Sequence, residues 1–322
     1  MRETSDEPRL SYAFLGTGQF AARCLELLSS WRLPSWVVTS PAKPAGRGGA
    51  STPTPVERFV RGVGALSGVP LIAAADASGD AAVIERMKGS PVDVTFVTDF
   101  GQLVREPLLA WEDRIGCLNI HPSMLPLYRG AAPVQRVLMD GLAETGVTIF
   151  KLARAMDSGP ILLQRKLAIG PGDDAGSLLD RAAYEGVRAF VEYVSSVSAE
   201  EWRFSPQDGS LATTAPKITR EEERIDWTAS AREILGKIRA LSPKPGAWTT
   251  AKGRRLRILQ AGECRAVSVG LAGELTPGSE GPLVASGAGS ICLKTVQMEG
   301  KKIQSAADWW NGIRAAAGEC LV

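Results

Sequence analysis

The sequence contains a single histidine, His121, among 322 residues. Zinc sites rich in histidine and the H-E-x-x-H helix both need more than one imidazole, so both are excluded. The five cysteines are scattered, and no two lie close enough for a C-x-x-C pair. An odd number of dispersed cysteines does not fit a disulfide framework either, which favours a reducing, cytoplasmic location. We expect no metal site, and any reaction that needs an imidazole must use His121.

Long apolar runs are also missing. No segment approaches the roughly 20 apolar residues that cross a bilayer. The first ten residues are charged and do not resemble a signal peptide, so we expect neither membrane association nor export. The composition, 44% hydrophobic and 22% charged, excludes wholesale disorder and is typical of a globular protein. The length predicts two domains of roughly 100–200 residues each.

The excess of positive over negative charge is small, but it is unevenly distributed along the chain. The net charge is +2, and the chain from Pro206 onward carries 16 Lys and Arg against 12 Asp and Glu. The remainder carries 21 against 23. This asymmetry indicates that the second domain meets an anionic partner, although an ordinary solvated surface is the alternative.

The first 120 residues alternate short apolar strands with helical patterns. Segment 10–15 ends in Gly16-Thr-Gly18, and the apolar residues from Phe20 to Leu28 recur at helical spacing. Further strands are expected at 36–39, 69–72, 92–97 and 117–120, with helices at 56–66 and 81–88 and a long loop at 40–55. This order predicts a Rossmann-like, doubly wound, mostly parallel sheet. Its ligands would lie beyond the carboxyl ends of the strands.

The second half changes character after one long helix. Strands are expected at 148–152 and 161–169, and Ser177 and Asp180 resemble a capping box for a helix that ends near 197. Further capping boxes begin at Ser230 and Ser305, and between them lie five short strands, at 247–250, 256–259, 273–275, 283–285 and 291–296. Such spacing predicts a small OB-like β-barrel. We therefore expect a first domain at 10–204, a polar linker at 205–218 and a smaller C-terminal domain at 219–322.

The glycine pair near the start offers one functional interpretation. Gly16-x-Gly18-x-x-Ala21 stands where a dinucleotide fingerprint would, which makes an NAD-dependent oxidoreductase an alternative. That fingerprint also needs an acidic residue roughly 20 positions further on to hold the ribose. No Asp or Glu occurs between Glu26 and Glu57. A tight strand-to-helix turn explains the glycines better.

A richer group of polar residues follows the strand at 117–120. Asn119 and His121 share one face of that strand, because side chains alternate along it. A proline-bracketed loop follows them directly, and Asp157 lies in a turn between two later strands. An amide can stabilise an oxyanion, an imidazole can transfer protons, and a carboxylate can orient the imidazole and favour its charged form. A structural histidine is the alternative, but the neighbouring amide and the position at a strand end favour catalysis.

The motifs around this group resemble those of the folate-dependent formyltransferases. The resemblance rests on Asn119-Ile-His-Pro-Ser-Met-Leu-Pro126, Arg129-Gly-Ala-Ala-Pro133 and Glu144-Thr-Gly-Val-Thr148. The loop Lys43-Pro-Ala-Gly-Arg-Gly48 and three C-terminal motifs are similar to the tRNA-formylating members: Ala215-Pro-Lys-Ile218, Arg224-Ile-Asp-Trp227 and Pro245-Gly-Ala-Trp248. The resemblance covers nearly the whole chain from about Leu10.

The resemblance implies a role for each matching residue. It makes Asn119, His121 and Asp157 catalytic and gives 10-formyltetrahydrofolate as the co-substrate. The expected folate-binding residues follow two strands: Phe100, Gly101, Gln102, Ser123, Met124, Leu125 and Pro126. The expected tRNA-binding residues are the cations of the loop and of the C-terminal domain: Lys43, Arg47, Arg254, Arg255, Arg257, Lys301 and Lys302.

The chain departs from the family pattern at four places. Gly18 replaces a common proline, Asp99 replaces a small residue, and Leu127 replaces a basic one. Gly49 and Ala50 stand where the family has a basic pair. None of these positions belongs to the expected catalytic group.

The expected function is formylation of the amino group of initiator methionyl-tRNA, with no membrane and no DNA among the partners. A nucleotide-sugar amine formyltransferase is the enzymatic alternative. Gly300-Lys-Lys302 and the helix capped at Ser305, which are similar to the ending of the tRNA-formylating members, argue against it. A protein of the same fold that binds tRNA or folate without catalysis is a third interpretation, and the intact catalytic group argues against that one.

Overall fold

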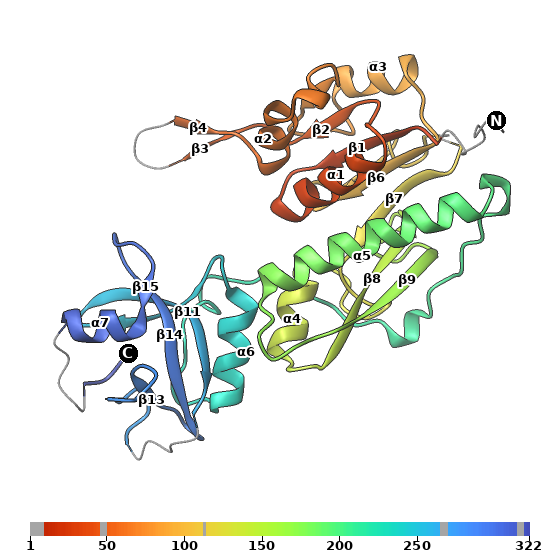
Figure 1. Ribbon diagram of the computed structural model, residues 1–322. Coiled ribbons are helices and arrows are strands. Elements are labelled where there is room, and N and C mark those ends of the chain that lie inside the picture. The colour runs from red at the N-terminus through yellow and green to blue at the C-terminus, as the bar shows by residue number, and fades with distance from the viewer. Residues whose placement is uncertain (1–9, 46–49, 112–113, 265–269, 314–318) are drawn as a thin grey trace, which may run out of the picture. The chain divides into compact units, whose positions relative to one another are not determined.

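A computed structural model describes residues 10–45, 50–111, 114–264, 270–313 and 319–322 (Figure 1). By its internal contacts the chain forms two compact units. The first unit comprises the residues up to Arg129, Gly146–Leu167 and Leu179–Thr213; the second comprises Gly130–Thr145, Ala168–Leu178 and Thr214–Val322. Each unit is built around its own hydrophobic core.

The first unit contains the expected mostly parallel sheet. Its strand order is β5-β2-β1-β6-β7-β8-β9; β5 to β7 run parallel, and β8 runs antiparallel to β7. The strand bounds are β1 (Tyr12–Gly16), β2 (Val37–Thr39), β5 (Leu71–Ala73), β6 (Val94–Thr98), β7 (Gly116–His121), β8 (Glu144–Lys151) and β9 (Ile161–Ala168).

Helices cover both faces of this sheet, as alternation along β1 shows. Tyr12 and Phe14 belong to one core cluster, with residues of α1 (Gln19–Trp31), α2 (Pro55–Gly62) and α5 (Ala175–Ser196). Ala13 and Leu15 belong to another cluster, with α3 (Ala81–Gly89). The sheet is therefore doubly wound, and the expected fold class is confirmed. A strand buried on both faces reads as a continuous apolar run, as residues 12–15 do.

Two local expectations in these units are wrong. The segment 40–55, expected as a long loop, contains the hairpin of β3 (Lys43–Ala45) and β4 (Ala50–Thr52). The long helix α5 begins earlier than expected: Asp174 accepts a hydrogen bond from the Ser177 backbone N–H, and the Ser177 hydroxyl accepts one from the Asp174 N–H. The residue that caps the helix is therefore Asp174, just before α5 begins at Ala175, and Ser177 is its partner three residues later. The Asp174 carboxylate accepts from one of the N–H groups that the first turn of a helix leaves without a partner.

The second unit is an antiparallel β domain, again as expected. The order is β10-β11-β14-β13-β12, with β15 beside β14. Its strands are β10 (Ala247–Ala251), β11 (Arg254–Glu263), β12 (Leu275–Thr276), β13 (Leu283–Ala285), β14 (Ser290–Met298) and β15 (Gln304–Ser305). Its helices are α4 (Pro133–Met139), α6 (Ala231–Leu241) and α7 (Ala306–Ile313). Among the described residues of both units, three short 3₁₀ turns occur: Gly64–Leu66, Ala199–Glu201 and Gly209–Leu211.

The last four residues connect the two end strands of this antiparallel sheet. Val322 exchanges two backbone hydrogen bonds with Thr250 of β10, at 2.7 and 3.0 Å. Glu319 accepts from the N–H of Leu275 in β12, and Leu321 donates to the Gly273 carbonyl, each at 2.8 Å. The strand order therefore closes through the C-terminal segment, as a barrel requires. The expected capping box at Ser230 is present. At Ser305 the hydroxyl accepts from the Asp308 N–H and donates to the Asp308 carboxylate, so the side-chain half of the expected box is present.

Candidate active site

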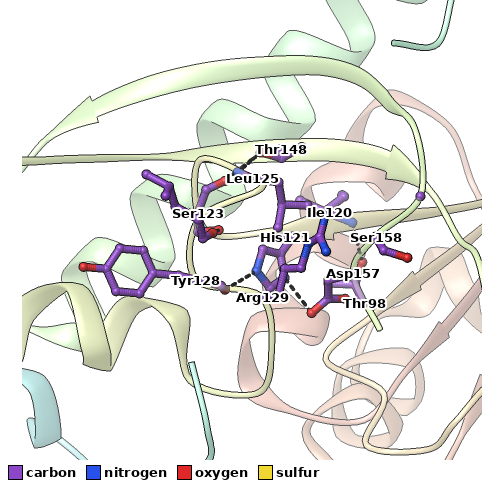
Figure 2. Close-up of polar contacts among 12 residues, drawn as sticks. Thr98, Ile120, His121, Ser123, Leu125, Tyr128, Arg129, Thr148, Asp157 and Ser158 are labelled. Atoms are coloured by element: carbon purple, nitrogen blue, oxygen red, sulfur yellow. Dashed lines mark hydrogen bonds and ion pairs between the residues drawn. The ribbon is translucent and has the colours of Figure 1, made fainter. Parts of the chain in front are cut away.

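His121 ends the buried strand β7 at the carboxyl edge of the sheet. Its side chain is almost fully enclosed, with 6% exposed. Nε2 lies 3.0 Å from the carbonyl oxygen of Tyr128, and Nδ1 lies 3.8 Å from a carboxylate oxygen of Asp157 (Figure 2). A carbonyl oxygen can only accept, so Nε2 carries the hydrogen. Nδ1 is then the nitrogen that is left to accept a proton.

The protonation of His121 is set by two opposing influences. Burial lowers the pKa of the imidazole below its ordinary value, because the charged form loses solvation. The Asp157 carboxylate and the Tyr128 carbonyl raise that pKa, but by less than burial lowers it. Asp157 thus favours the charged form of His121, as expected, but the effect of burial on the pKa is larger. The resting imidazole is therefore neutral near pH 7 and can accept a proton.

Asn119 lies two positions before His121 on β7, on the same face of the strand. It is half-buried and stands opposite Phe150 of β8. Among the residues that the structure describes, none hydrogen-bonds to the Asn119 side-chain amide. Its N–H groups are thus available to a ligand at the strand end, which is the geometry that an oxyanion donor needs.

The loop after His121 is held by hydrogen bonds from β8 and β9. The Thr148 hydroxyl donates to the Ser123 carbonyl at 2.7 Å and accepts from the Leu125 N–H at 3.1 Å. Gln164 donates to the Leu125 carbonyl at 2.8 Å. Thr148 and Gln164 were not expected as site residues, although both lie on expected strands. Their contacts hold the backbone of residues 123–126, the segment expected to bind folate.

The three residues of the other segment expected to bind folate, 100–102, differ in their surroundings. Phe100 is buried in the core with Leu15 and Val97, so its ring is not an exposed wall. The Gln102 amide is occupied internally: Oε1 accepts from the Ala77 N–H, and Nε2 donates to the Ser40 hydroxyl and the Ala74 carbonyl. Gly101 is exposed and has a φ of +71°. Of these three residues, the backbone around Gly101 is what remains open to a ligand.

Two departures from the family pattern compensate each other. A Cβ at position 18 would overlap the Asp99 carboxylate, so Gly18 leaves the space that the acid occupies. The carboxylate accepts hydrogen bonds from the backbone N–H groups of Phe20 and Ala21, in the first turn of α1. Burial nevertheless raises the pKa of Asp99 above its ordinary value. An internal carboxylate thus fills the place where a dinucleotide fingerprint binds pyrophosphate, which argues further against NAD.

The expected tRNA-binding cations fall into separate places. Lys43 is exposed at the start of β3, and Arg47 lies outside the described residues. Arg254, Lys301 and Lys302 line one groove of about 430 Å³ in the second unit. Arg255 and Arg257 line another, of about 520 Å³, together with Lys244.

The two arginines of the larger groove have internal partners. Arg255 lies 3.1 Å from Glu223 and stacks 4.4 Å from the centre of the Trp248 ring. The Arg257 guanidinium donates to Gln297 at 2.8 Å, to the Pro243 carbonyl at 3.2 Å and to the Pro245 carbonyl. Arg257 therefore holds the 243–245 turn. Arg254 makes a single bond of this kind, to the Glu299 carbonyl at 2.8 Å, and Lys301 and Lys302 are exposed, so the Arg257 charge is less free for a phosphate than the charges of these three.

The fold and the site define a formyl transferase. The family model described as "Formyl transferase" matches residues 10–194, and the model described as "Formyl transferase, C-terminal domain" matches residues 217–314. Both units are thus covered by models of one family.

Full-length relatives narrow the class. The chain is 36% identical over 310 residues to the methionyl-tRNA formyltransferase of Moorella thermoacetica, and the aligned residues make up 96% of this chain and 98% of the relative. It is 39% identical over 319 residues to that of Roseiflexus sp., spanning 97% and 95%. The chain therefore belongs to the methionyl-tRNA formyltransferases of the formyl transferase family.

A more distant structure shares the fold. HypX from Aquifex aeolicus, solved in complex with tetrahydrofolic acid, aligns with 96% of this chain and 48% of its own length. The TM-score is 0.61 at 16% identity, so this likeness extends to the fold alone. Among the residues described here, no helix is long and apolar enough to span a membrane.

Proposed function

We propose that this protein transfers the formyl group of 10-formyltetrahydrofolate to the amino group of initiator methionyl-tRNA. The product is N-formylmethionyl-tRNA, which serves translation initiation in the cytoplasm. The full-length relatives named above support this substrate. The observation that carries the chemistry is the enclosed imidazole of His121, held between the Tyr128 carbonyl and Asp157 and next to Asn119 on the strand.

The residues suit an addition–elimination at the formyl carbon. The amino nitrogen attacks that carbon, and the carbonyl oxygen becomes an oxyanion that the Asn119 amide stabilises. His121 Nδ1 accepts the proton lost by the amine, and the imidazolium that forms gains the attraction of Asp157. The bond from carbon to the folate nitrogen then breaks, and the proton returns to that nitrogen. Atoms and charge balance within this sequence, and no step requires a metal.

Folate is proposed to bind at the carboxyl ends of β6 and β7. Gly101 and the loop from Ser123 to Pro126 follow these strands, and the loop backbone is held by Thr148 and Gln164. Met124, half-buried in this loop, supplies apolar surface for a flat pterin. Phe100 and Gln102 support this region from within, because their side chains have internal contacts.

The tRNA is proposed to contact the 43–52 hairpin and the basic grooves of the C-terminal domain. Lys43 and Arg47 are the cations expected to meet the acceptor end. Arg254, Lys301 and Lys302 offer exposed charge to the phosphate backbone, and Arg255 and Arg257 line the adjacent groove. Residues 10–204 would carry catalysis, and residues 219–322 would carry tRNA binding.

A transfer assay tests the proposal directly. Purified protein receives formyl-labelled 10-formyltetrahydrofolate together with initiator methionyl-tRNA or, in a parallel reaction, with an amino-sugar nucleotide. We expect label in acid-precipitable methionyl-tRNA and none in the sugar nucleotide. Label in the sugar nucleotide alone would replace the proposal by the alternative enzyme, and label in neither would leave a binding protein without catalysis.

A further inference from the structure

The segment 205–213, the first part of the expected polar linker at 205–218, holds the two polar groups that lie against the His121 imidazole, the Tyr128 carbonyl and the Asp157 carboxylate. Its start is fixed to β9: Ile161 and Ser205 exchange two backbone hydrogen bonds, at 2.7 and 2.8 Å. Two of its side chains, Gln207 and Thr213, then reach the neighbourhood of the imidazole from opposite ends of the segment. All of these residues belong to the first unit.

Gln207 uses its whole amide in this arrangement. Nε2 donates to the carbonyl oxygens of Asp157 and Gly159, at 2.9 and 2.7 Å. Oε1 accepts from the Nε and Nη2 of Arg129, at 3.1 and 2.7 Å. Two donors and two acceptor positions are thus satisfied at once. Only an amide of this length supplies both, because a glutamate would lack the donors.

The turn that carries Asp157 needs such support. Asp157 has a φ of +50°, a left-handed conformation that costs free energy for a residue other than glycine. Gly159 approaches the Lys151 carbonyl so closely that a Cβ would overlap it. The two carbonyls that Gln207 holds belong to Asp157 itself and to Gly159, two residues later. The Asp157 carboxylate faces His121 only while the turn keeps its shape.

The same segment also holds the other partner of His121. The Thr213 hydroxyl accepts from the Tyr128 N–H at 2.8 Å, and the Thr213 carbonyl accepts from the Arg129 N–H at 2.9 Å. The Tyr128 carbonyl, in turn, accepts from His121 Nε2. Arg129 links the two ends, because its backbone bonds to Thr213 and its side chain bonds to Gln207.

We propose that Gln207 is a positioning residue for the formyl transfer: through Arg129 and the Asp157–Gly159 turn, its amide holds the Asp157 carboxylate against the His121 imidazole. This inference rests on the proposed function for its kinetic consequence but not for its geometric one. Gln207 touches neither the imidazole nor the reacting atoms. Its loss therefore acts on the orientation of Asp157.

The single histidine makes the geometric consequence measurable. In protein without a histidine tag, the only imidazole C–H signals in a proton NMR spectrum belong to His121. Their titration reports the His121 pKa, which Asp157 raises. Gln207→Met keeps the length of the side chain and its neutrality, but it removes both donors and the acceptor. We expect this variant to lower the measured pKa of His121, because the carboxylate moves away.

The kinetic consequence is a split between kcat and KM. Misplacement of a catalytic group by about 1 Å costs on the order of 100-fold, so we expect kcat to fall about 10- to 100-fold in Gln207→Met. KM for 10-formyltetrahydrofolate should stay within about twofold, because Gln207 contacts none of the proposed folate residues. Gln207→Glu retains an acceptor for Arg129 and should show the same kcat loss, which assigns the effect to the lost donors.

Asp208→Ala is the matched control. Asp208 lies next to Gln207 and caps the 209–211 turn, where its carboxylate accepts from the Ser210 N–H and hydroxyl. The substitution removes this cap. We expect an unchanged His121 pKa and unchanged kcat, although the turn is loosened. Circular dichroism and thermal melts show which variants are folded, and Gln207→Glu carries the kinetic test if Gln207→Met does not fold.

The outcomes separate this inference from the proposed function. If folded Gln207 variants melt earlier but keep the wild-type His121 pKa and kcat, Gln207 is only structural and the inference is overturned. An equal effect of Asp208→Ala would overturn it as well. If the wild type does not formylate methionyl-tRNA, the proposed function fails, whereas a lowered His121 pKa in Gln207→Met would still establish the positioning.

Discussion

At the scale of single side chains, His121 illustrates how enclosure sets reactivity. Burial lowers its pKa, Asp157 partly restores it, and the Tyr128 carbonyl fixes which nitrogen carries the hydrogen. The result is a neutral base whose free nitrogen faces a carboxylate 3.8 Å away. That carboxylate stabilises the imidazolium that forms when the proton arrives, so the pair is better matched to the charged intermediate than to the resting state.

The pH dependence of activity follows from this arrangement. Because the neutral imidazole accepts the proton, kcat/KM should rise with pH through a His121 pKa that lies below 6.5, and it should be level above that. Asp157→Asn removes the contribution that raises the pKa, so the rise should move to lower pH. Rate profiles at constant ionic strength measure this, with the NMR titration as an independent check. A rise centred above 6.5 would contradict the assignment of a buried base.

Removal of the imidazole should abolish most of the activity. General acid–base catalysis contributes about 10²- to 10⁴-fold, and we expect His121→Ala to lose that much in kcat while staying folded. Formyl transfer to methionyl-tRNA measures the loss, and circular dichroism is the control for the fold. A loss below about tenfold would remove His121 from the mechanism.

Gly18 and Asp99 form a second pair at this scale, and it concerns stability. Gly18→Ala forces a methyl group onto the Asp99 carboxylate, and such overpacking costs about 1–3 kcal/mol. In an Asp99→Ala background that conflict is gone, so the same change should cost much less. Urea unfolding of the two single variants and the double variant measures the coupling, which we expect at about 0.5–3 kcal/mol. Additive costs would show that the two positions are independent.

At the scale of elements, the C-terminal segment 319–322 takes the place of a strand between β10 and β12 of the antiparallel domain. Leu321 is 3% exposed and belongs to the core of the second unit. Val322 bonds to Thr250 of β10, and Glu319 of the same segment bonds to Leu275 of β12. The sheet would otherwise present two unpaired edges, and such edges promote association between molecules.

Deletion of residues 319–322 should therefore destabilise the second unit. The loss of one buried leucine and four backbone hydrogen bonds predicts a decrease in unfolding free energy of about 2–5 kcal/mol. Leu321→Ala is the matched control, because it removes the buried side chain and keeps the backbone bonds. Thermal and urea unfolding give both values. If truncation costs no more than Leu321→Ala, the backbone closure contributes nothing.

At the scale of the whole molecule, the net charge is only +2, but the cations of the second unit lie in different settings. The cations that the sequence groups together differ in their structural roles: Arg254, Lys301 and Lys302 line one groove, whereas Arg257 is committed to the 243–245 turn. Phosphate contacts displace counterions, so binding through the first group would depend steeply on salt.

Charge removal in that groove tests the tRNA interface. We expect a combined Arg254→Ala, Lys301→Ala and Lys302→Ala variant to weaken tRNA binding and to flatten the slope of log K against log salt by about one per lost contact. Lys294→Ala, an exposed lysine of the same unit outside the groove, should leave the slope unchanged. The groove variant should also lose more affinity than Arg47→Ala. An unchanged slope in the triple variant would place the interface elsewhere.

The sequence by itself determined the features that depend on neighbours along the chain. Alternation and helical spacing gave both folds, because a strand or helix buries the residues that its own period places inward. The helix caps at Ser230 and Ser305 were readable because each joins residues three apart. The lone histidine and its proline-rich loop identified the candidate site, and comparison with relatives confirmed the family.

Tertiary structure alone decided the rest, for a physical reason. Gln207 bonds to the backbone of a residue 50 positions away, Thr213 to one 85 positions away, and Val322 to one 72 positions away. Whether a side chain such as Arg257 is buried and bonded, or free to meet a phosphate, depends on which distant carbonyls the fold places beside it. No local period encodes those distances, because they arise only when separate elements pack together.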